Sequence, residues 1–151
     1  MPVWLIVLIA VLFGVAIFVV LAILVTRLSR KSARRWAEEN PDKEILLSAN
    51  GANCLAFPGE KITLRGNGLL VLTPEELHFR MWAPEKILEL PLQNIVSADL
   101  VKSFAGRRGR FPLLHITFHG GDGRIMETAW SVVAPKDWAR RINELKGRES
   151  D

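Results

Sequence analysis

An uncharged apolar segment near the start of the chain constrains its fold more than any other feature. The segment covers residues 3–25, consists almost entirely of aliphatic and aromatic residues, and contains Gly14 as its only strongly helix-weakening residue. About 20 apolar helical residues span the hydrocarbon core of a bilayer, where the backbone must satisfy its own hydrogen bonds. We therefore predict a transmembrane helix, the anchor, within residues 1–26.

A cleaved secretory signal is the alternative interpretation of this segment. The sequence disfavours it because no basic residue precedes the segment and because the segment is longer than a signal core. No small-x-small cleavage site precedes the basic residues that follow. Trp4 also lies where an interfacial aromatic side chain is expected. The sequence favours an uncleaved anchor.

Basic residues crowd only the C-terminal flank of the apolar segment. Five of them fall within nine positions: Arg27, Arg30, Lys31, Arg34 and Arg35. Because basic flanks stay on the cytoplasmic side, we predict a single-pass protein of the cell membrane, with its amino terminus outside and the remaining chain in the cytoplasm. These side chains also attract anionic lipid headgroups. Residues 27–43 are predicted to form a basic juxtamembrane helix and linker, which Asn40-Pro41 ends.

The net charge of +4 belongs mostly to this flank. Residues 27–43 carry six basic and three acidic side chains, whereas residues 44–151 carry 14 basic and 13 acidic ones. A nearly neutral domain offers no general surface for nucleic acid, so we expect no nucleic-acid partner. Cys54 is the single cysteine, which excludes an internal disulfide and a multi-cysteine zinc site. We interpret it as a small apolar strand residue.

Polar and apolar residues alternate through most of the chain after Pro41, which predicts β-strands. The alternating segments cover residues 44–49, 53–57, 61–65, 69–73, 77–82, 86–90, 95–101, 113–118 and 124–130. We expect six or seven antiparallel strands from them, with Asn50-Gly51 as a turn. The period then changes: Trp138, Ile142 and Leu145 form one helical stripe after Pro135, and Gly147 is predicted to end this helix. A sandwich or half-open barrel capped by the helix would bury that stripe.

Three consecutive segments carry a family resemblance: Gly68-x-Leu70-x-Leu72-Thr73, Leu77-x-Phe79 and Leu88-x-Leu90-Pro91-Leu92-x-x-Ile95. They resemble the core of pleckstrin-homology-like (PH-like) and GRAM-like domains, where a G-x-L-x-L-T…L-x-F hairpin is followed by an I-x-L-P-L-x-x-I strand. In this chain, Leu88 occupies the position where the family pattern has its first isoleucine. The resemblance covers about residues 44–147 and implies one PH-like, mainly-β (α+β) domain with a C-terminal helix, followed by a tail at residues 148–151.

No residue pattern indicates catalysis. His115 and His119 would lie about 13 Å apart along one strand, too far to share a metal ion. No serine lies in the Gly-x-Ser-x-Gly motif that presents a nucleophilic serine. Residues 106–110 lack the Gly-Lys-Ser/Thr ending of a phosphate-binding loop. The carboxylates are scattered, without a recognisable acid/base pair. We predict a non-enzymatic protein without cofactor or metal site.

The strongest binding candidate is a predicted loop, the cationic segment, with Arg107, Arg108 and Arg110. Their planar guanidinium groups suit phosphate, so this segment is predicted to bind anionic lipid headgroups at the membrane face. A solvated hairpin tip is the alternative. Phosphoinositide-binding relatives of the resembled fold carry a basic K-x-n-K/R-x-R pattern on the first hairpin, where this chain has only Lys61 and Arg65.

A membrane-tethered docking module for a protein partner is the alternative function. The resembled fold also docks peptides and proteins, by strand addition or beside its C-terminal helix. Trp82 is the candidate docking residue, because it lies opposite the face that carries Leu77, Phe79 and Met81. Its alternative role is to cover one end of the barrel.

Overall fold

The computed structural model describes residues 1–149, except for the side chains of Leu28, Ser29 and Glu149. The chain forms two compact units, Met1–Glu39 and Asn40–Asp151, and each is described by itself. The last two residues of the predicted tail, Ser150 and Asp151, lie outside the described residues.

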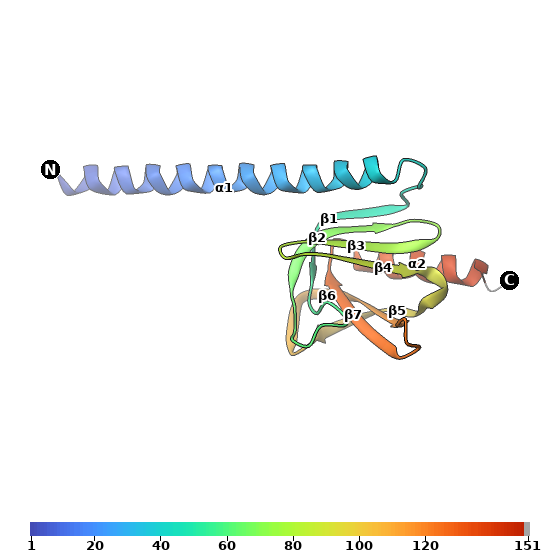
Figure 1. Cartoon of the computed structure of the whole chain (residues 1–151). Coiled ribbons are helices and arrows are strands. Elements are labelled where there is room, and N and C mark those ends of the chain that lie inside the picture. The colour runs from blue at the N-terminus through green and yellow to red at the C-terminus, as the bar shows by residue number, and fades with distance from the viewer. Residues whose placement is uncertain (150–151) are drawn as a thin grey trace. The chain divides into compact units, whose positions relative to one another are not determined.

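The first unit is a single continuous helix, α1 (Val3–Glu39), drawn in blue in Figure 1. Its 37 residues include an 18-residue window with a mean hydropathy of 3.4. Within the described part of the chain, α1 is the one helix whose length and composition would allow it to cross a membrane. The helix continues through the basic flank and ends before Asn40-Pro41, as predicted, because a residue before proline disfavours the helical conformation.

The second unit is one curled antiparallel sheet closed by a helix (Figure 1). The sheet has the order β4-β3-β2-β1-β7-β6-β5 and forms a half-barrel. Its strands are β1 (Leu47–Cys54), β2 (Gly66–Leu72), β3 (Glu76–Trp82), β4 (Glu85–Pro91), β5 (Ile95–Phe104), β6 (Arg107–His119) and β7 (Ile125–Ser131). A short 3-10 helix, η1 (Leu92–Asn94), joins β4 to β5, and α2 (Pro135–Glu149) follows β7. The predicted fold class is confirmed.

The core fills the concave side of the half-barrel, where alternate residues of each strand point inward. Phe79 and Trp130 meet edge to face, with ring centroids 5.5 Å apart. Cys54 is fully buried, which confirms its interpretation as a small apolar strand residue. The predicted stripe on α2 is buried in the same core: Trp138, Ile142 and Leu145. Every member of this core cluster comes from residues 46–145, within the second unit.

Three local predictions are wrong. The segments 44–49 and 53–57 both contribute to one strand, β1, and Asn50-Gly51 lies at a β-bulge in it rather than in a turn. Residues 61–65 form no strand; they belong to the connection between β1 and β2. The terminal helix also continues through Gly147 to Glu149, since Gly147 does not adopt the left-handed conformation that would end it.

Candidate functional site

The three arginines of the cationic segment lie at the start of β6, and not in a loop as predicted. The β5–β6 hairpin turns within two residues, Ala105 (φ 51°) and Gly106 (φ 74°). Positive φ at both central residues is typical of the tight turn that joins two twisted strands. Phe104 therefore pairs with Arg107, and Ser103 pairs with Arg108.

A bulge in β6 follows directly and alters the direction of its side chains. Ser103 pairs with Arg108 whereas Val101 pairs with Leu113, so residues 109–112 oppose Lys102 alone. Phe111, within this bulge, is 69% exposed, and the Arg110 guanidinium carbon lies 5.8 Å from its ring centroid. The hairpin thus presents a cation and an aromatic ring side by side. We use the name basic hairpin for Lys102, Arg107, Arg108, Arg110 and Phe111.

The charges of the basic hairpin are solvent-exposed and uncompensated. Among the described residues, no carboxylate forms an ion pair with Lys102 or with the three arginines. Exposed arginines without carboxylate partners keep their donors free for an anionic ligand. The structure therefore brings Arg107, Arg108 and Arg110 together on one exposed hairpin, in the neighbourhood that the sequence predicted.

Arg65, from the first-hairpin region, has a structural role. Its Nε donates to the carbonyl oxygen of Leu55 (3.0 Å), and its Nη2 donates to the carbonyl oxygen of Ala105 (2.8 Å). These two bonds tie the connection before β2 to the turn of the basic hairpin. Arg65 thus holds the hairpin in place through two hydrogen bonds to backbone carbonyl oxygens.

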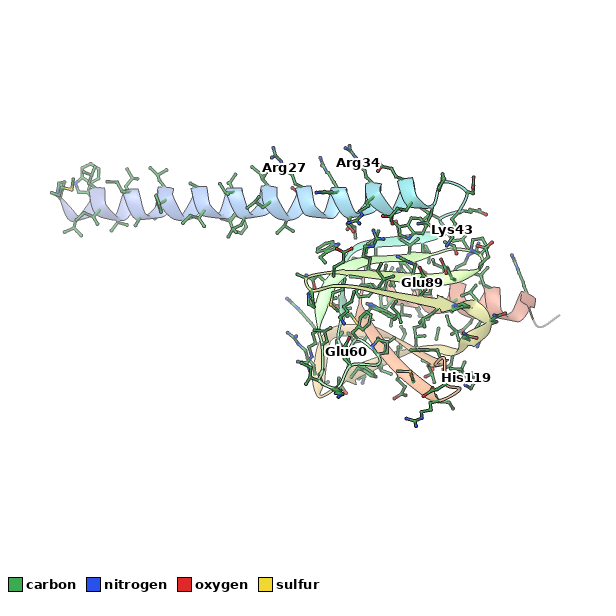
Figure 2. All side chains as sticks on the ribbon, in the orientation of Figure 1. Arg27, Arg34, Lys43, Glu60, Glu89 and His119 are labelled. Carbon is green, nitrogen blue, oxygen red and sulfur yellow. The ribbon has the colours of Figure 1, made fainter. Side chains whose placement is uncertain are left out.

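The basic residues of α1 form a stripe along the helix. Arg27, Arg30, Lys31 and Arg34 follow the i, i+3, i+4, i+7 spacing of one helical face. Figure 2 shows Arg27 and Arg34 on the same side of α1. Arg35 lies beside this stripe, and its Nε is 3.1 Å from the Glu39 carboxylate. The stripe begins directly after the apolar segment.

Trp82 ends β3 and reaches across the neighbouring strand toward the bulge in β1. A side chain at Gly51 would meet the Trp82 ring at 4.0 Å. The ring therefore lies over the bulge, close to backbone, and contributes packing there. In the described part of the chain, no three histidine, cysteine or acidic side chains gather as a metal site would require.

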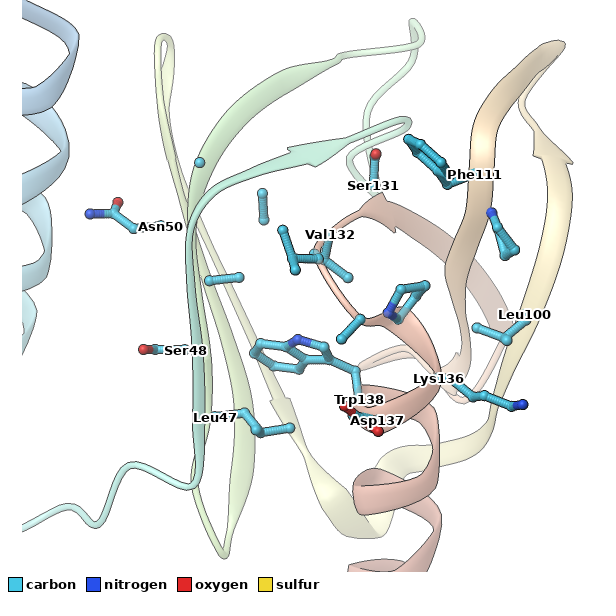
Figure 3. Close-up of a pocket in the computed structure, with 17 residues that line it drawn as sticks. Leu47, Ser48, Asn50, Leu100, Phe111, Ser131, Val132, Lys136, Asp137 and Trp138 are labelled. Atoms are coloured by element: carbon cyan, nitrogen blue, oxygen red, sulfur yellow. The ribbon is translucent and has the colours of Figure 1, made fainter.

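A groove that the sequence did not reveal lies between β1 and the start of α2 (Figure 3). Its volume is about 1050 Å³, and its lining is mostly apolar. Leu47 and Trp138 point toward each other across it, whereas Ser48 and Asn50 point away from it. The groove exists because β7 leaves β1 at Ser131, and no sequence pattern marks that position.

Comparison with known proteins supports the fold. No family model matches the chain, and no curated protein matches it in sequence. The C-terminal domain of an unknown protein from Leishmania infantum is similar in structure, with a TM-score of 0.51 and 16% identity over 76% of this chain and 96% of that chain. The DH/PH domains of p115-RhoGEF give a TM-score of 0.49 at 13% identity, over 72% of this chain and 32% of that chain. The N-terminally truncated linker-DH/PH domains of p115-RhoGEF give a TM-score of 0.46 at 13% identity, over 71% of this chain and 30% of that chain.

Proposed function

We propose that the chain is a membrane-anchored, non-enzymatic module whose β-domain recognises anionic lipid headgroups at the cytoplasmic face through the basic hairpin. The observation that carries this proposal is the hairpin itself, which presents exposed arginines without carboxylate partners beside an exposed aromatic ring. Guanidinium groups bind phosphate in a bidentate manner, and aromatic side chains favour the membrane interface.

Because α1 would anchor the chain, weak headgroup binding is sufficient to orient the β-domain at the membrane. Each basic residue near an anionic membrane surface contributes about 1 kcal/mol, so the four cations of the hairpin contribute roughly 4 kcal/mol. That corresponds to a weak affinity for a free domain. A domain tethered by α1 meets the membrane at a high effective concentration, and a weak contact then sets its orientation. The basic stripe on α1 would add to the same attraction.

Flotation of the β-domain with lipid vesicles tests the proposal. The fragment 41–151 is suitable because it contains every residue of the core cluster of the β-domain. We expect it to float with vesicles that contain phosphatidylserine and to remain unbound with phosphatidylcholine alone. Because the attraction is electrostatic, binding should weaken as salt rises. The triple variant R107A/R108A/R110A should not float.

A matched variant controls for the loss of three positive charges. Arg124, Arg140 and Arg148 are exposed arginines elsewhere on the domain, and the variant R124A/R140A/R148A should float like the unchanged fragment. Equal loss in both triple variants would mean that net charge, and not the hairpin, drives binding. If no fragment floats with any vesicle, the headgroup function is refuted and α1 alone supplies membrane attachment.

A further inference from the structure

Three exposed apolar side chains gather around the groove between β1 and the start of α2. Leu100 of β5 is 39% exposed, Phe111 of β6 is 69% exposed, and Val133 of the β7–α2 connection is 88% exposed. All three line the groove, and Figure 3 shows Phe111 at one end of it. We call these three residues the apolar face. An exposed apolar patch beside an apolar groove marks a surface that contacts another molecule or a membrane.

Sharp features of the backbone direct two of these side chains outward. Phe111 lies in the bulge of β6, and bulges alter the direction of side chains. A side chain at Gly109 would lie 2.6 Å from the carbonyl oxygen of Phe111, so the bulge is tightly closed. Val133 precedes Ala134, whose left-handed conformation (φ 52°) turns the chain from β7 into α2. The apolar face is therefore presented by the sheet and its corner rather than by a long loop.

Cations of the basic hairpin adjoin the apolar face. The Arg110 guanidinium carbon lies 5.8 Å from the centroid of the Phe111 ring, and Lys102 opposes the same bulge. The apolar face and the basic hairpin share Phe111, so they form one continuous surface. Among the described residues, none of the hairpin cations forms an ion pair with a carboxylate. An apolar centre with a basic margin is typical of surfaces that lie in the interface of an anionic membrane.

Charge selects a membrane over the other occupants of this surface. A second copy in a symmetric contact would bring the basic hairpins of both chains to one interface, where like charges repel. An uncharged acyl ligand in the groove would leave the cations of the hairpin without an anionic partner. An anionic membrane offers headgroup phosphates for the cations and, directly beneath them, an apolar region for the side chains. The helix α1 is long and apolar enough to cross such a membrane, which would hold the β-domain near its surface.

We propose that the apolar face inserts into the boundary between the headgroups and acyl chains of an anionic membrane, while the basic hairpin binds the surrounding headgroups. This inference rests on the proposed headgroup function and adds a second contact region, the β7–α2 corner at Val133. One hairpin alone can tilt on a membrane, whereas contacts from β5, β6 and that corner fix the orientation of the β-domain. The groove then faces the membrane, and lipid covers its apolar lining.

The experiment uses the full chain in lipid vesicles, with one environment-sensitive fluorophore attached to a single cysteine. In the C54A background, F111C and V133C place the fluorophore on the apolar face. I125C is the matched control, because Ile125 is 66% exposed and pairs with His119 at the opposite end of β6. With phosphatidylserine present, spin-labelled lipids should quench the fluorophore at residues 111 and 133 and not at residue 125. Vesicles of phosphatidylcholine alone should give weak quenching at all three positions.

A substitution at an exposed position tests the apolar component without disturbing the core. V133D should lower the ratio of inserted to solvent-exposed fluorophore at residue 111 about tenfold or more, because a charge replaces an apolar side chain that the membrane would bury. I125D adds the same charge outside the groove lining and should leave this ratio unchanged. Equal ratios for V133D and I125D would overturn the proposal.

Flotation and quenching together separate this inference from the headgroup function. If flotation of the fragment 41–151 requires the hairpin arginines but neither fluorophore on the apolar face is quenched, insertion is overturned and headgroup binding stands. If flotation and quenching are both absent, both proposals are overturned. A fluorophore that is shielded from water without being quenched by lipid would mean that a second copy covers the apolar face, which also overturns insertion.

Discussion

At the residue scale, Gly68 explains why the Gly-x-Leu-x-Leu-Thr segment begins with glycine. It pairs with Met81 of β3, and a side chain at this position would lie 2.1 Å from the carbonyl oxygen of Arg80. No atom can approach backbone so closely, so the two strands would have to separate. The glycine permits the close pairing of β2 and β3 on which the first half of the sheet depends.

Substitution of Gly68 should therefore destabilise the β-domain. We expect G68A to lower the free energy of unfolding by about 2 kcal/mol or more, because the added methyl group overpacks the sheet. Urea denaturation of the fragment 41–151 measures this change. Gly121, in the β6–β7 turn, has no atom within 4 Å of an added methyl group, and G121A should change stability by less than about 0.5 kcal/mol. Similar stability of both variants would contradict the close pairing.

Cys54 gives the domain a pH dependence on the alkaline side. Its Sγ lies 3.7 Å from Thr128 Oγ1 within the core, and burial raises the pKa of the thiol from 9.0 to about 11. The folded state thus holds the proton more tightly than the unfolded state. Stability from this group is present below pH 9 and is lost as pH rises toward 11. The full loss is roughly 2 to 3 kcal/mol.

The variant C54A isolates this contribution. Between pH 9 and 11 the unchanged fragment should lose more unfolding free energy than C54A, in urea titrations at each pH. The native thiol should also resist alkylation by iodoacetamide at pH 8, and react only after denaturation, since the thiol and not the thiolate is present. Parallel pH profiles of the two proteins would show that Cys54 does not titrate in this range.

At the scale of elements, the sequence predicts most strands but misplaces their turns. Alternation predicts most of the strands from β2 to β7, although β2 and β3 are buried on both faces, and the 3.6-residue period identifies α2. Asn50-Gly51 has the composition of a hairpin turn, yet it bulges because β2 pairs with β1 on both sides of it. Ala105 lacks any turn signal, so Gly106 and Gly109 predict a loop over residues 106–110 in place of a two-residue turn. Long-range pairing decides both cases.

The groove shows that sequence-based prediction of a site has the same limit, because long-range pairing decides which residues meet. The arginines of the basic hairpin are neighbours in sequence, so their clustering follows from the sequence alone. The groove joins residues from β1, the β5–β6 region and the β7–α2 connection, which only the sheet order brings together. Neither composition nor spacing indicates where β7 separates from β1. The edge of β1 is therefore visible only in the folded chain.

The turn of the basic hairpin offers a stabilising substitution. Ala105 adopts a left-handed conformation at φ 51°, which costs an L-residue with a β-carbon about 1 kcal/mol or more. Asparagine tolerates this conformation, and Asn-Gly is a preferred pair for such turns. We expect A105N to stabilise the fragment by about 0.5–1 kcal/mol, measured as a higher midpoint in urea. Phe104→Asn, outside the turn, should bring no gain. An unchanged or lower midpoint for A105N would contradict the turn geometry.

At the scale of the whole molecule, α1 cannot be covered by one small domain. Residues 3–25 are apolar on every side of the helix, whereas a helix packed on a globular domain needs only one apolar face. A lipid environment covers all sides at once. The β-domain, in contrast, has a core cluster of its own. The apolar segment and the β-domain therefore suit different solvents, and the basic stripe begins directly after the apolar segment.

We therefore expect the full chain to remain in membranes during alkaline carbonate extraction, while the fragment 41–151 is released. Arginine at the helix centre costs about 2.5 to 3.5 kcal/mol, so the variant V11R/V15R should enter the soluble fraction. The matched variant A33R/A37R, beyond the apolar segment, should stay membrane-bound. Because basic residues follow the segment, a protease outside intact cells should leave a C-terminal tag uncut, and cell lysis should expose it. Release of the unchanged chain, or an amino terminus trimmed within residues 3–25, would identify the segment as a cleaved signal instead.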